Sequence, residues 1–293
     1  MKKIFMAVIA LMMTISVSAQ FYIYFSDGAV AQVDSISLVA PQEQESEPIE
    51  PIEGVFSVST SKQVTFSRGN LQYHPANDEW RFAESQLDYI GEANCKISST
   101  YNGWLDLFAW STDNPATPFG VSRSETTSDY YGDFVDWGKN RIENDYPTTW
   151  RTLTNEEWYY LLRERNNATN LRGVAQVNGV NGIIILPDNW ICPTGITFKS
   201  GFHSDFGIEG YALHQTFTSA QWSKMETAGA VFLPAAGDAC GSEGDFTQQD
   251  GSYWSATKQQ GKSAIFFWFC ASNDGMTSIH RKYRHSVRLV KDL

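Results

Sequence analysis

The segment WRTLTNEEWYYLLR at residues 150–163 decides how the centre of this chain folds. Thr154 stands three residues before Glu157, which is the spacing of a capping box. In that motif each of the two side chains accepts a hydrogen bond from the other residue's backbone N–H at the start of a helix. Trp158 follows at once, where it can lie against a core. We therefore predict a helix from Thr154 to about Arg165.

A second segment, TSAQW at residues 218–222, repeats the arrangement. Thr218 precedes Gln221 by three residues, so it again forms a capping box. The helix should end near Ala228, because Gly229 follows and glycine commonly ends helices. The sequence thus predicts two main helices with the same entry geometry.

Strand signals dominate the rest of the domain. Residues 55–59 and 63–67 alternate with period two, as strands do. Residues 174–186 hold two Asn-Gly pairs between β-prone runs, which favours a hairpin. Residues 110–150 are rich in Gly, Asn, Asp, Ser and aromatic residues, so they predict long irregular loops held by aromatic packing. The expected class is α+β, with two main helices, short antiparallel sheets and much irregular loop.

The first nineteen residues predict a secretory signal peptide. Lys2 and Lys3 precede an apolar run at residues 4–13, and small residues lead to a cut after Ala19. This pattern is too short and wrongly flanked for a spanning helix, and no other stretch approaches membrane length. We therefore expect an exported protein, secreted or at the cell surface, with no membrane insertion.

Three regions are predicted after residue 19. Residues 20–40 predict a short strand module, because a Ser-Asp-Gly turn separates two β-prone runs. Residues 41–53 contain five Glu and three Pro, which predicts an extended, solvated linker. The main domain is predicted at residues 54–293, which is long enough for one sizeable core.

The chain is acidic, with a formal net charge of −11. Such a charge argues against nucleic acid as a partner. The charge is uneven, however, because residues 280–291 hold five Lys or Arg and no acid. We therefore predict a local basic pole on the C-terminal face.

Two segments resemble one known family, the formylglycine-generating-enzyme-like branch of the C-type-lectin-like fold. The first is residues 150–163, where four residues match the branch's first-helix motif and its Pro is missing. The second is the C-terminal end, where a Gly-x-Trp-Ser turn leads to a strand with Arg and a closing Val-Arg-x-Val. The matching residues are Leu153, Thr154, Glu157, Trp158, Gly251, Trp254, Ser255, Arg281 and residues 287–290. The resemblance implies a C-type-lectin-like domain.

The sequence is more similar still to a group of secreted gut-bacterial proteins of this fold, over about residues 54–293. The shared stretches are residues 66–73, 80–82, 103–108, 150–153, 186–190, 230–237 and 253–255. Diversity-generating retroelements randomise surface residues at the C-terminal end of some members, which varies their ligand specificity. The resemblance therefore implies retroelement diversification as a hypothesis. An adenine-biased near-repeat of the 3′ coding end beside a reverse transcriptase would test it.

The candidate ligand-binding residues lie near the C-terminus, where aromatic, histidine and basic side chains are crowded. They are Phe266, Trp268, His280, Lys282, Tyr283 and His285. Such groups are costly to bury together and supply much of the energy of interfaces, so we predict contact with a protein or glycan ligand on another surface. A second interpretation of residues 264–270 stays open, because both faces are apolar, as in a strand buried on both sides. Arg281 and Arg288 are predicted to be structural.

Signals for a cofactor are weak. Asp238, Glu243, Asp245 and Asp250 leave calcium as an alternative, but their spacing matches no calcium loop. The four cysteines, Cys95, Cys192, Cys240 and Cys270, fit no metal motif and allow three disulfide pairings. We expect no cofactor.

Signals for catalysis are weak as well. The resemblance implies that a copper oxidase of this branch needs a close cysteine pair near its C-terminus, whereas Cys240 and Cys270 lie thirty residues apart. His203 and His214 lack the partner spacing of an iron site, and Asp133 and Asp136 beside Trp137 are only a loose hint of sugar chemistry. We therefore expect no enzyme.

Two alternatives to ligand binding stay open. The protein is a structural surface or fimbria-associated component if residues 264–285 prove mostly buried or scattered. It is an oxidase or hydrolase if the purified protein holds copper, iron or zinc.

Overall fold

The computed structural model describes residues 21–24, 30–33 and 51–293. The predicted signal peptide at residues 1–19 lies outside these residues, as does most of the predicted linker. The chain forms two compact units, residues 1–46 and 47–293. In the first unit, β1 (Phe21–Tyr24) pairs antiparallel with β2 (Val30–Val33), within the region predicted as a strand module.

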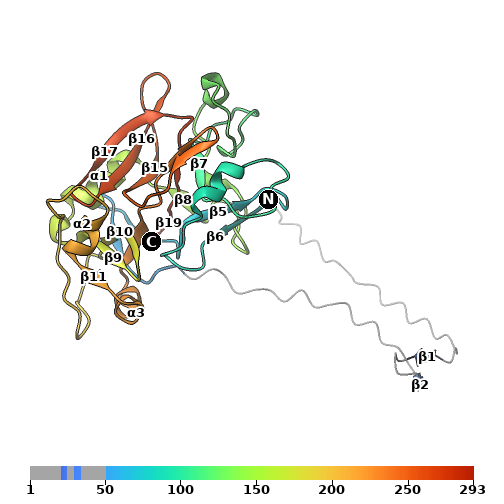
Figure 1. The fold of residues 1–293 in the computed structure, drawn as a ribbon, viewed down its shortest axis with the longest axis horizontal. Coiled ribbons are helices and arrows are strands. Elements are labelled where there is room, and N and C mark those ends of the chain that lie inside the picture. The colour runs from blue at the N-terminus through green and yellow to red at the C-terminus, as the bar shows by residue number, and fades with distance from the viewer. Residues whose placement is uncertain (1–20, 25–29, 34–50) are drawn as a thin grey trace, which may run out of the picture. The chain divides into compact units, whose positions relative to one another are not determined.

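The second unit is a mixed α+β domain, built mostly of sheets with a few short helices and long loops (Figure 1). Its largest sheet contains β7 (Leu107–Ala109), β13 (Asp238–Cys240), β14 (Glu243–Asp245), β15 (Asp250–Lys258), β16 (Ser263–Cys270), β17 (Asn273–His280) and β18 (Arg284–Ser286). The strand order is β14-β13-β18-β15-β16-β17, with β7 paired to β18. β17 is therefore an edge strand.

The second sheet has the order β11-β9-β10-β12. Its strands are β9 (Arg172–Val177), β10 (Val180–Ile185), β11 (Thr216–Phe217) and β12 (Val231–Pro234). Asn178 and Gly179 join β9 to β10 with φ values of +48° and +85°. Positive φ at both positions is the type I′ geometry that an Asn-Gly pair favours, so the predicted hairpin is confirmed.

The third sheet has the order β3-β4-β19-β8. Its strands are β3 (Phe56–Ser57), β4 (Gln63–Phe66), β8 (Arg151–Thr152) and β19 (Leu289–Asp292). The strand β19 thus lies between two strands from much earlier in the chain. A separate hairpin, β5 (Leu71–His74) and β6 (Glu79–Phe82), lies on the right of the domain in Figure 1.

Both predicted capping boxes are present. In α1 (Asn155–Tyr159) and in α3 (Ser219–Thr227) the threonine and its partner exchange side-chain-to-backbone hydrogen bonds. The first helix continues as a π-helical turn, η4 (Tyr160–Glu164), so it ends where predicted. A third helix, α2 (Glu209–His214), was not predicted. The 3₁₀ turns are η1 (Gly91–Lys96), η2 (Thr127–Tyr130), η3 (Trp137–Lys139) and η5 (Ala168–Asn170).

Mutation of Thr218 tests whether the capping box stabilises the start of α3. Thr218→Ala removes the side-chain acceptor of the Gln221 N–H, and we expect it to lower the free energy of unfolding by about 1 kcal/mol. Urea denaturation measures the change. Ser223→Ala on the exposed side of the same helix is the control and should stay within about 0.5 kcal/mol. Equal effects of the two variants would contradict the capping role.

Three clusters of buried apolar side chains form the core. In the first, Trp158 of α1 stacks on Phe267 of β16, with ring centroids 5.2 Å apart. This cluster includes Ile52, whose N–H donates to the Phe66 carbonyl. The compact domain therefore begins before residue 54, the predicted boundary.

Strand β16 is buried on both sides over most of its length. Phe266, Phe267, Phe269 and Cys270 are all buried, which is the second of the two interpretations that the sequence left open. In the part of the chain that the structure describes, none of the helices is long and apolar enough to cross a membrane.

Candidate functional site

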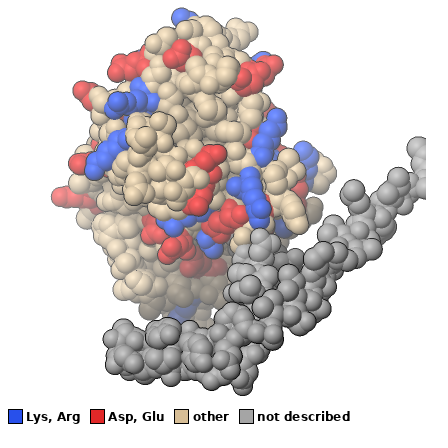
Figure 2. All heavy atoms as spheres, turned by 90° about the vertical axis from the view of Figure 1, so that its right-hand side faces the viewer, with Lys and Arg blue, Asp and Glu red and all other residues tan. Residues whose placement is uncertain are grey.

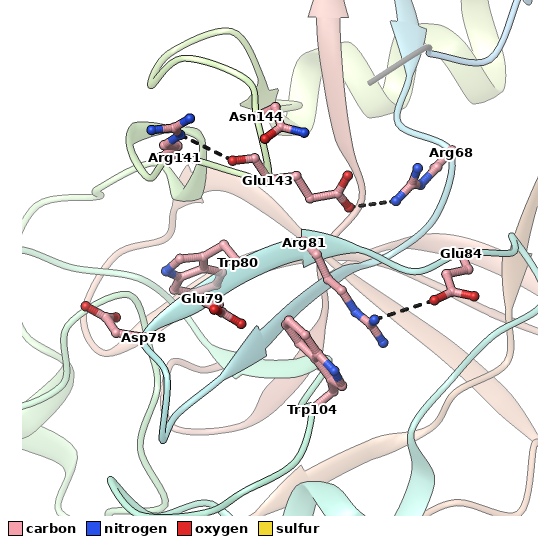
Figure 3. A pocket seen from close by; sticks show the side chains of 10 residues that line it. All are labelled: Arg68, Asp78, Glu79, Trp80, Arg81, Glu84, Trp104, Arg141, Glu143 and Asn144. Atoms are coloured by element: carbon pink, nitrogen blue, oxygen red, sulfur yellow. Dashed lines mark hydrogen bonds and ion pairs between the residues drawn. The ribbon is translucent and has the colours of Figure 1, made fainter. Parts of the chain in front are cut away.

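A hollow of about 530 Å³ lies beside strand β6 and is the candidate binding groove (Figure 3). Its lining includes Arg68, Trp80, Arg81, Trp104 and Glu143. On β6, Trp80 and Phe82 are buried, while Glu79 is exposed and Arg81 half-buried. This alternation places Arg81 on the accessible side of the hairpin.

Arg81 is held in place from two directions. Its guanidinium carbon lies 3.9 Å from the centroid of the Trp104 ring, and its Nε donates to Gln72 Oε1 at 2.9 Å. Its Nη1 lies 3.6 Å from Glu84, a carboxylate that is 80% exposed, so that ion pair is weak. The result is a pre-oriented guanidinium beside an aromatic ring.

A second charged pair forms another wall of the groove. Arg68 Nη2 donates to Glu143 Oε1 at 2.6 Å, and the Phe82 N–H donates to the same oxygen at 3.0 Å. Arg141 Nε donates to the Glu143 backbone carbonyl at 3.3 Å. These contacts fix the loop around Glu143 against the hairpin, as Figure 3 shows.

A second hollow, of about 640 Å³, adjoins the first and shares Asp78 and Trp80 with it. Its lining is more apolar and includes Tyr73, Ile97, Phe119 and Val121. The Tyr73 and Trp80 rings lie 4.4 Å apart, and Phe119 meets Trp80 edge-on at 5.8 Å.

Tyr73 is tied to the hairpin turn through its hydroxyl. The Tyr73 hydroxyl donates to Asp78 Oδ1 at 2.9 Å. Burial and this carboxylate together raise the pKa of Tyr73 to about 12, so the phenol keeps its proton at neutral pH. The ring is thereby fixed as a wall of the second hollow.

Charges of both signs line the first hollow. Arg68, Arg81 and Arg141 meet Asp78, Glu79, Glu84 and Glu143 there. Figure 2 shows the side of the molecule on which β5 and β6 lie, where basic and acidic side chains are interspersed. Such a surface offers donors and acceptors side by side and no strong single-sign field.

Comparison with known proteins adds no assignment. No family model, no curated protein and no solved structure matches this chain. The site is therefore interpreted from its own geometry.

Two of the predicted ligand-binding residues cannot contact a ligand. His285 is fully buried and Phe266 is 5% exposed. The two rings stack 4.5 Å apart, and Trp254 lies 4.5 Å from His285 on another side. The prediction is wrong for these two positions because both rings pack against Trp254 in the second core cluster.

The other four predicted residues do not form one patch. Trp268 pairs with Gly275, whereas His280 pairs with Ser263, five residues away along β16. At roughly 3.4 Å per residue this separates Trp268 from His280 by about 17 Å. Trp268, half-buried, donates through its indole Nε1 to Asp250. The half-buried Lys282 and Tyr283 lie beyond His280 in the turn before β18.

The predicted basic pole is also absent from the surface. Arg281, Arg284 and Arg288 are all at most 5% exposed, so of the five basic residues only Lys282 and Lys291 reach solvent. Arg281 donates to the Tyr130 and Gly132 carbonyls. Arg288 donates to the amide oxygens of Asn70 and Gln86. The predicted structural role of Arg281 and Arg288 is confirmed.

The candidate acidic and histidine residues are engaged locally. Asp238 and Asp245 pair across β13 and β14, and burial and the neighbouring carboxylates raise the pKa of Asp238 to about 6. His203 accepts from the Asp205 N–H, and His214 lies 3.2 Å from the Lys199 carbonyl. Across residues 51–293, no group of three or more His, Cys, Asp or Glu could hold a metal ion.

The remaining candidates have structural partners. Asp136 accepts from the Thr152 and Gly138 N–H groups, and the exposed Asp133 pairs with Lys258. The four cysteines, all within residues 51–293, carry free thiols.

The groove itself was not predicted. Arg68, Trp80, Trp104 and Glu143 come from four segments that meet only in the folded chain. The available signal was the Trp-Arg-Phe run at residues 80–82, where aromatic and charged residues alternate. From the sequence alone, that run is only a stretch shared with similar proteins.

Proposed function

We propose that this protein is an exported, non-catalytic ligand-binding protein and that it binds a glycan in the groove beside β6. The observation that supports this most is the pair of half-buried side chains, Trp104 and the Arg81 stacked on it, in one hollow. Aromatic rings offer apolar faces on which sugar rings can lie. Hydroxyl groups both donate and accept hydrogen bonds, so they match a lining that mixes guanidinium and carboxylate groups.

The same lining favours a neutral glycan over a charged one. Three arginines and four carboxylates line the hollow, so their charges nearly balance and no strong single-sign field selects an ion. Sites that bind small ligands typically combine apolar walls with a few fixed polar groups.

The fold family of the domain, its export and its diversification are also proposals. The residues that resemble the C-type-lectin-like fold support that fold, and residues 1–19 support export to the medium or the cell surface. Retroelement diversification would have to act on half-exposed positions such as Trp268 and Tyr283, because Phe266 and His285 are buried.

The test is glycan-array capture by the wild type and by two groove variants. Trp104→Ala removes the ring under Arg81, and Arg81→Gln removes the guanidinium. We expect each to weaken binding at least about tenfold, which corresponds to about 1.4 kcal/mol. Lys258→Gln is the matched control, because it removes an exposed cation whose partner is Asp133, outside the groove; it should bind as the wild type does.

A structural role is the second candidate, and one observation favours it. Ten of residues 264–285 are buried, nine are half-buried and only Asn273, Thr277 and Ser278 are exposed, so no aromatic patch forms, as expected if these aromatics only hold loops together. Under this alternative the folded protein captures no glycan, and the groove variants change nothing. Copper, iron or zinc in the purified protein would instead favour the oxidase or hydrolase alternative.

A further inference from the structure

We infer that the domain has a second binding site, separate from the groove, in which a hollow at the turn between β15 and β16 binds an oxyanion group of an acidic ligand. The hollow has a volume of about 400 Å³, and we call it the cationic hollow. Its lining consists of Gly132, Lys258, Gln259, Gln260, Gly261 and Arg281. This lining holds two cations and no acid, whereas cations and acids are mixed in the groove beside β6.

Arg281 is the fixed cation of this hollow. It is 5% exposed, and its guanidinium carbon lies 4.4 Å from the centroid of the Trp110 ring. Its Nε donates to the Ser263 carbonyl at 3.3 Å, and its Nη1 donates to the Gly132 carbonyl at 3.2 Å. These contacts hold the guanidinium in one orientation before a ligand arrives, which reduces the entropic cost of binding.

The charge of Arg281 has no carboxylate partner within residues 51–293. None of the ion pairs formed by these residues includes Arg281, and its acceptors there are all backbone carbonyls. Its Nη2 donates to none of these residues, yet Nη2 is not sealed in the interior as the Nε atoms of Arg284 and Arg288 are. Because charged groups at low exposure need a partner, Nη2 offers an unused donor to an anion in the hollow.

Other basic residues surround the same hollow. Lys258 lines it, and Lys262 belongs to the same turn; both are exposed. Burial and the charges of Lys282, Lys262 and Arg281 lower the pKa of His280, so these three cations act on one imidazole. The whole chain carries a net charge of −11, so this turn is a local exception. Gathered cations of this kind raise the local concentration of anions.

One acid competes with an incoming anion. Asp133 Oδ1 lies 3.1 Å from Lys258 Nζ, but the two side chains are 84% and 63% exposed, so the pair is weak. The neighbouring Asp113 is engaged within the loop, where its Oδ1 accepts from the Asp133 N–H. Lys258 can therefore exchange Asp133 for an oxyanion, and loss of the Asp133 carboxylate should strengthen anion binding.

The test titrates the protein with sodium sulfate, sodium phosphate and sodium acetate, each replacing sodium chloride at constant ionic strength. The backbone amide NMR signals of Gly132 and residues 259–262 report on the hollow. We expect saturable shifts of these signals with at least one probe, and the probe that binds best identifies the preferred group. Shifts that stay linear with concentration for all three probes, or no shifts, would overturn the inference.

Three variants separate this site from a general effect of charge. Lys258→Gln should weaken the affinity for the best probe about twofold to fivefold, and Asp133→Asn should strengthen it by a similar factor. Lys224→Gln is the matched control, because it removes an exposed cation of α3, which lies below β15 and β16 in Figure 1; it should leave the affinity unchanged. Equal losses in the two lysine variants would mean that net charge alone attracts the anion, and the site would be rejected.

Two further variants complete the test. Arg281→Gln removes the fixed donor and should weaken probe binding at least about tenfold, with circular dichroism confirming the fold. The Lys258 and Asp133 variants decide the question even if Arg281→Gln does not fold. Trp104→Ala should leave probe binding unchanged, whereas it should weaken glycan capture. Failure of the cationic hollow is therefore distinguishable from failure of the groove.

Discussion

Asp274→Ala is expected to lower the free energy of unfolding by about 3–5 kcal/mol. The Asp274 side chain is 2% exposed and binds two arginines. Arg163 Nη2 lies 2.5 Å from Oδ1, and Arg172 Nε lies 2.8 Å from Oδ2. Loss of the carboxylate leaves Arg172, 7% exposed at its side chain, as an uncompensated buried charge.

Urea denaturation followed by circular dichroism measures this loss. The matched control is Asp292→Ala, because Asp292 pairs with Arg151 at 2.6 Å but is 62% exposed. An exposed pair contributes about 0–1 kcal/mol. If both variants shift the urea midpoint equally, burial does not explain the strength of the Asp274 site.

His285→Phe is expected to change how stability depends on pH. Burial lowers the pKa of His285 to about 3, and both ring nitrogens are buried without a hydrogen-bond partner among the described residues. In the unfolded chain the pKa is about 6.5. Below pH 6.5 the unfolded chain therefore binds a proton that the folded protein excludes, and His285 lowers stability progressively down to about pH 3.

The size of this effect is roughly 1.4 kcal/mol per pH unit across that window. Phe keeps the stacking on Phe266 and Trp254 but cannot take up a proton, so the variant should lose less stability than the wild type between pH 6.5 and 4. Unfolding midpoints at several pH values measure the difference. Parallel curves would mean that His285 takes up a proton equally in both states.

The comparison must be between variant and wild type, because two carboxylates act in the opposite direction. Burial raises the pKa of Asp106 to about 6, and the pKa of Asp238 is also about 6. Folding is therefore favoured as pH falls through 6 toward the unfolded value near 3.9. The dependence of wild-type stability on pH contains the contributions of all three groups. The difference in stability between the wild type and His285→Phe at each pH contains only the contribution of His285.

The parts of the fold that the sequence predicts are those with local causes. Thr154 and Thr218 define helix starts through contacts three residues away, and Asn178-Gly179 defines a turn through its own backbone angles. The position of β19 between β4 and β8 depends instead on pairing over more than 130 residues. Helix α2 has no side-chain cap at Ile208, so it lacked a start signal.

The candidate site was harder to predict for a related reason. Burial of Phe266 and His285 depends on what covers the sheet, and strand alternation does not reveal that when both faces are apolar. Arg281, Arg284 and Arg288 look like surface charges in sequence, yet they donate hydrogen bonds to backbone carbonyls and side-chain amides inside the domain. The groove has no local signature because its walls come from distant segments.

The position of β19 also sets the order in which the molecule can be completed. A growing chain releases residues 63–66 and 151–152 long before residues 289–292. Until the last segment arrives, β4 and β8 have no strand between them and the third sheet cannot close. The third sheet can therefore close only after residues 289–292 have emerged.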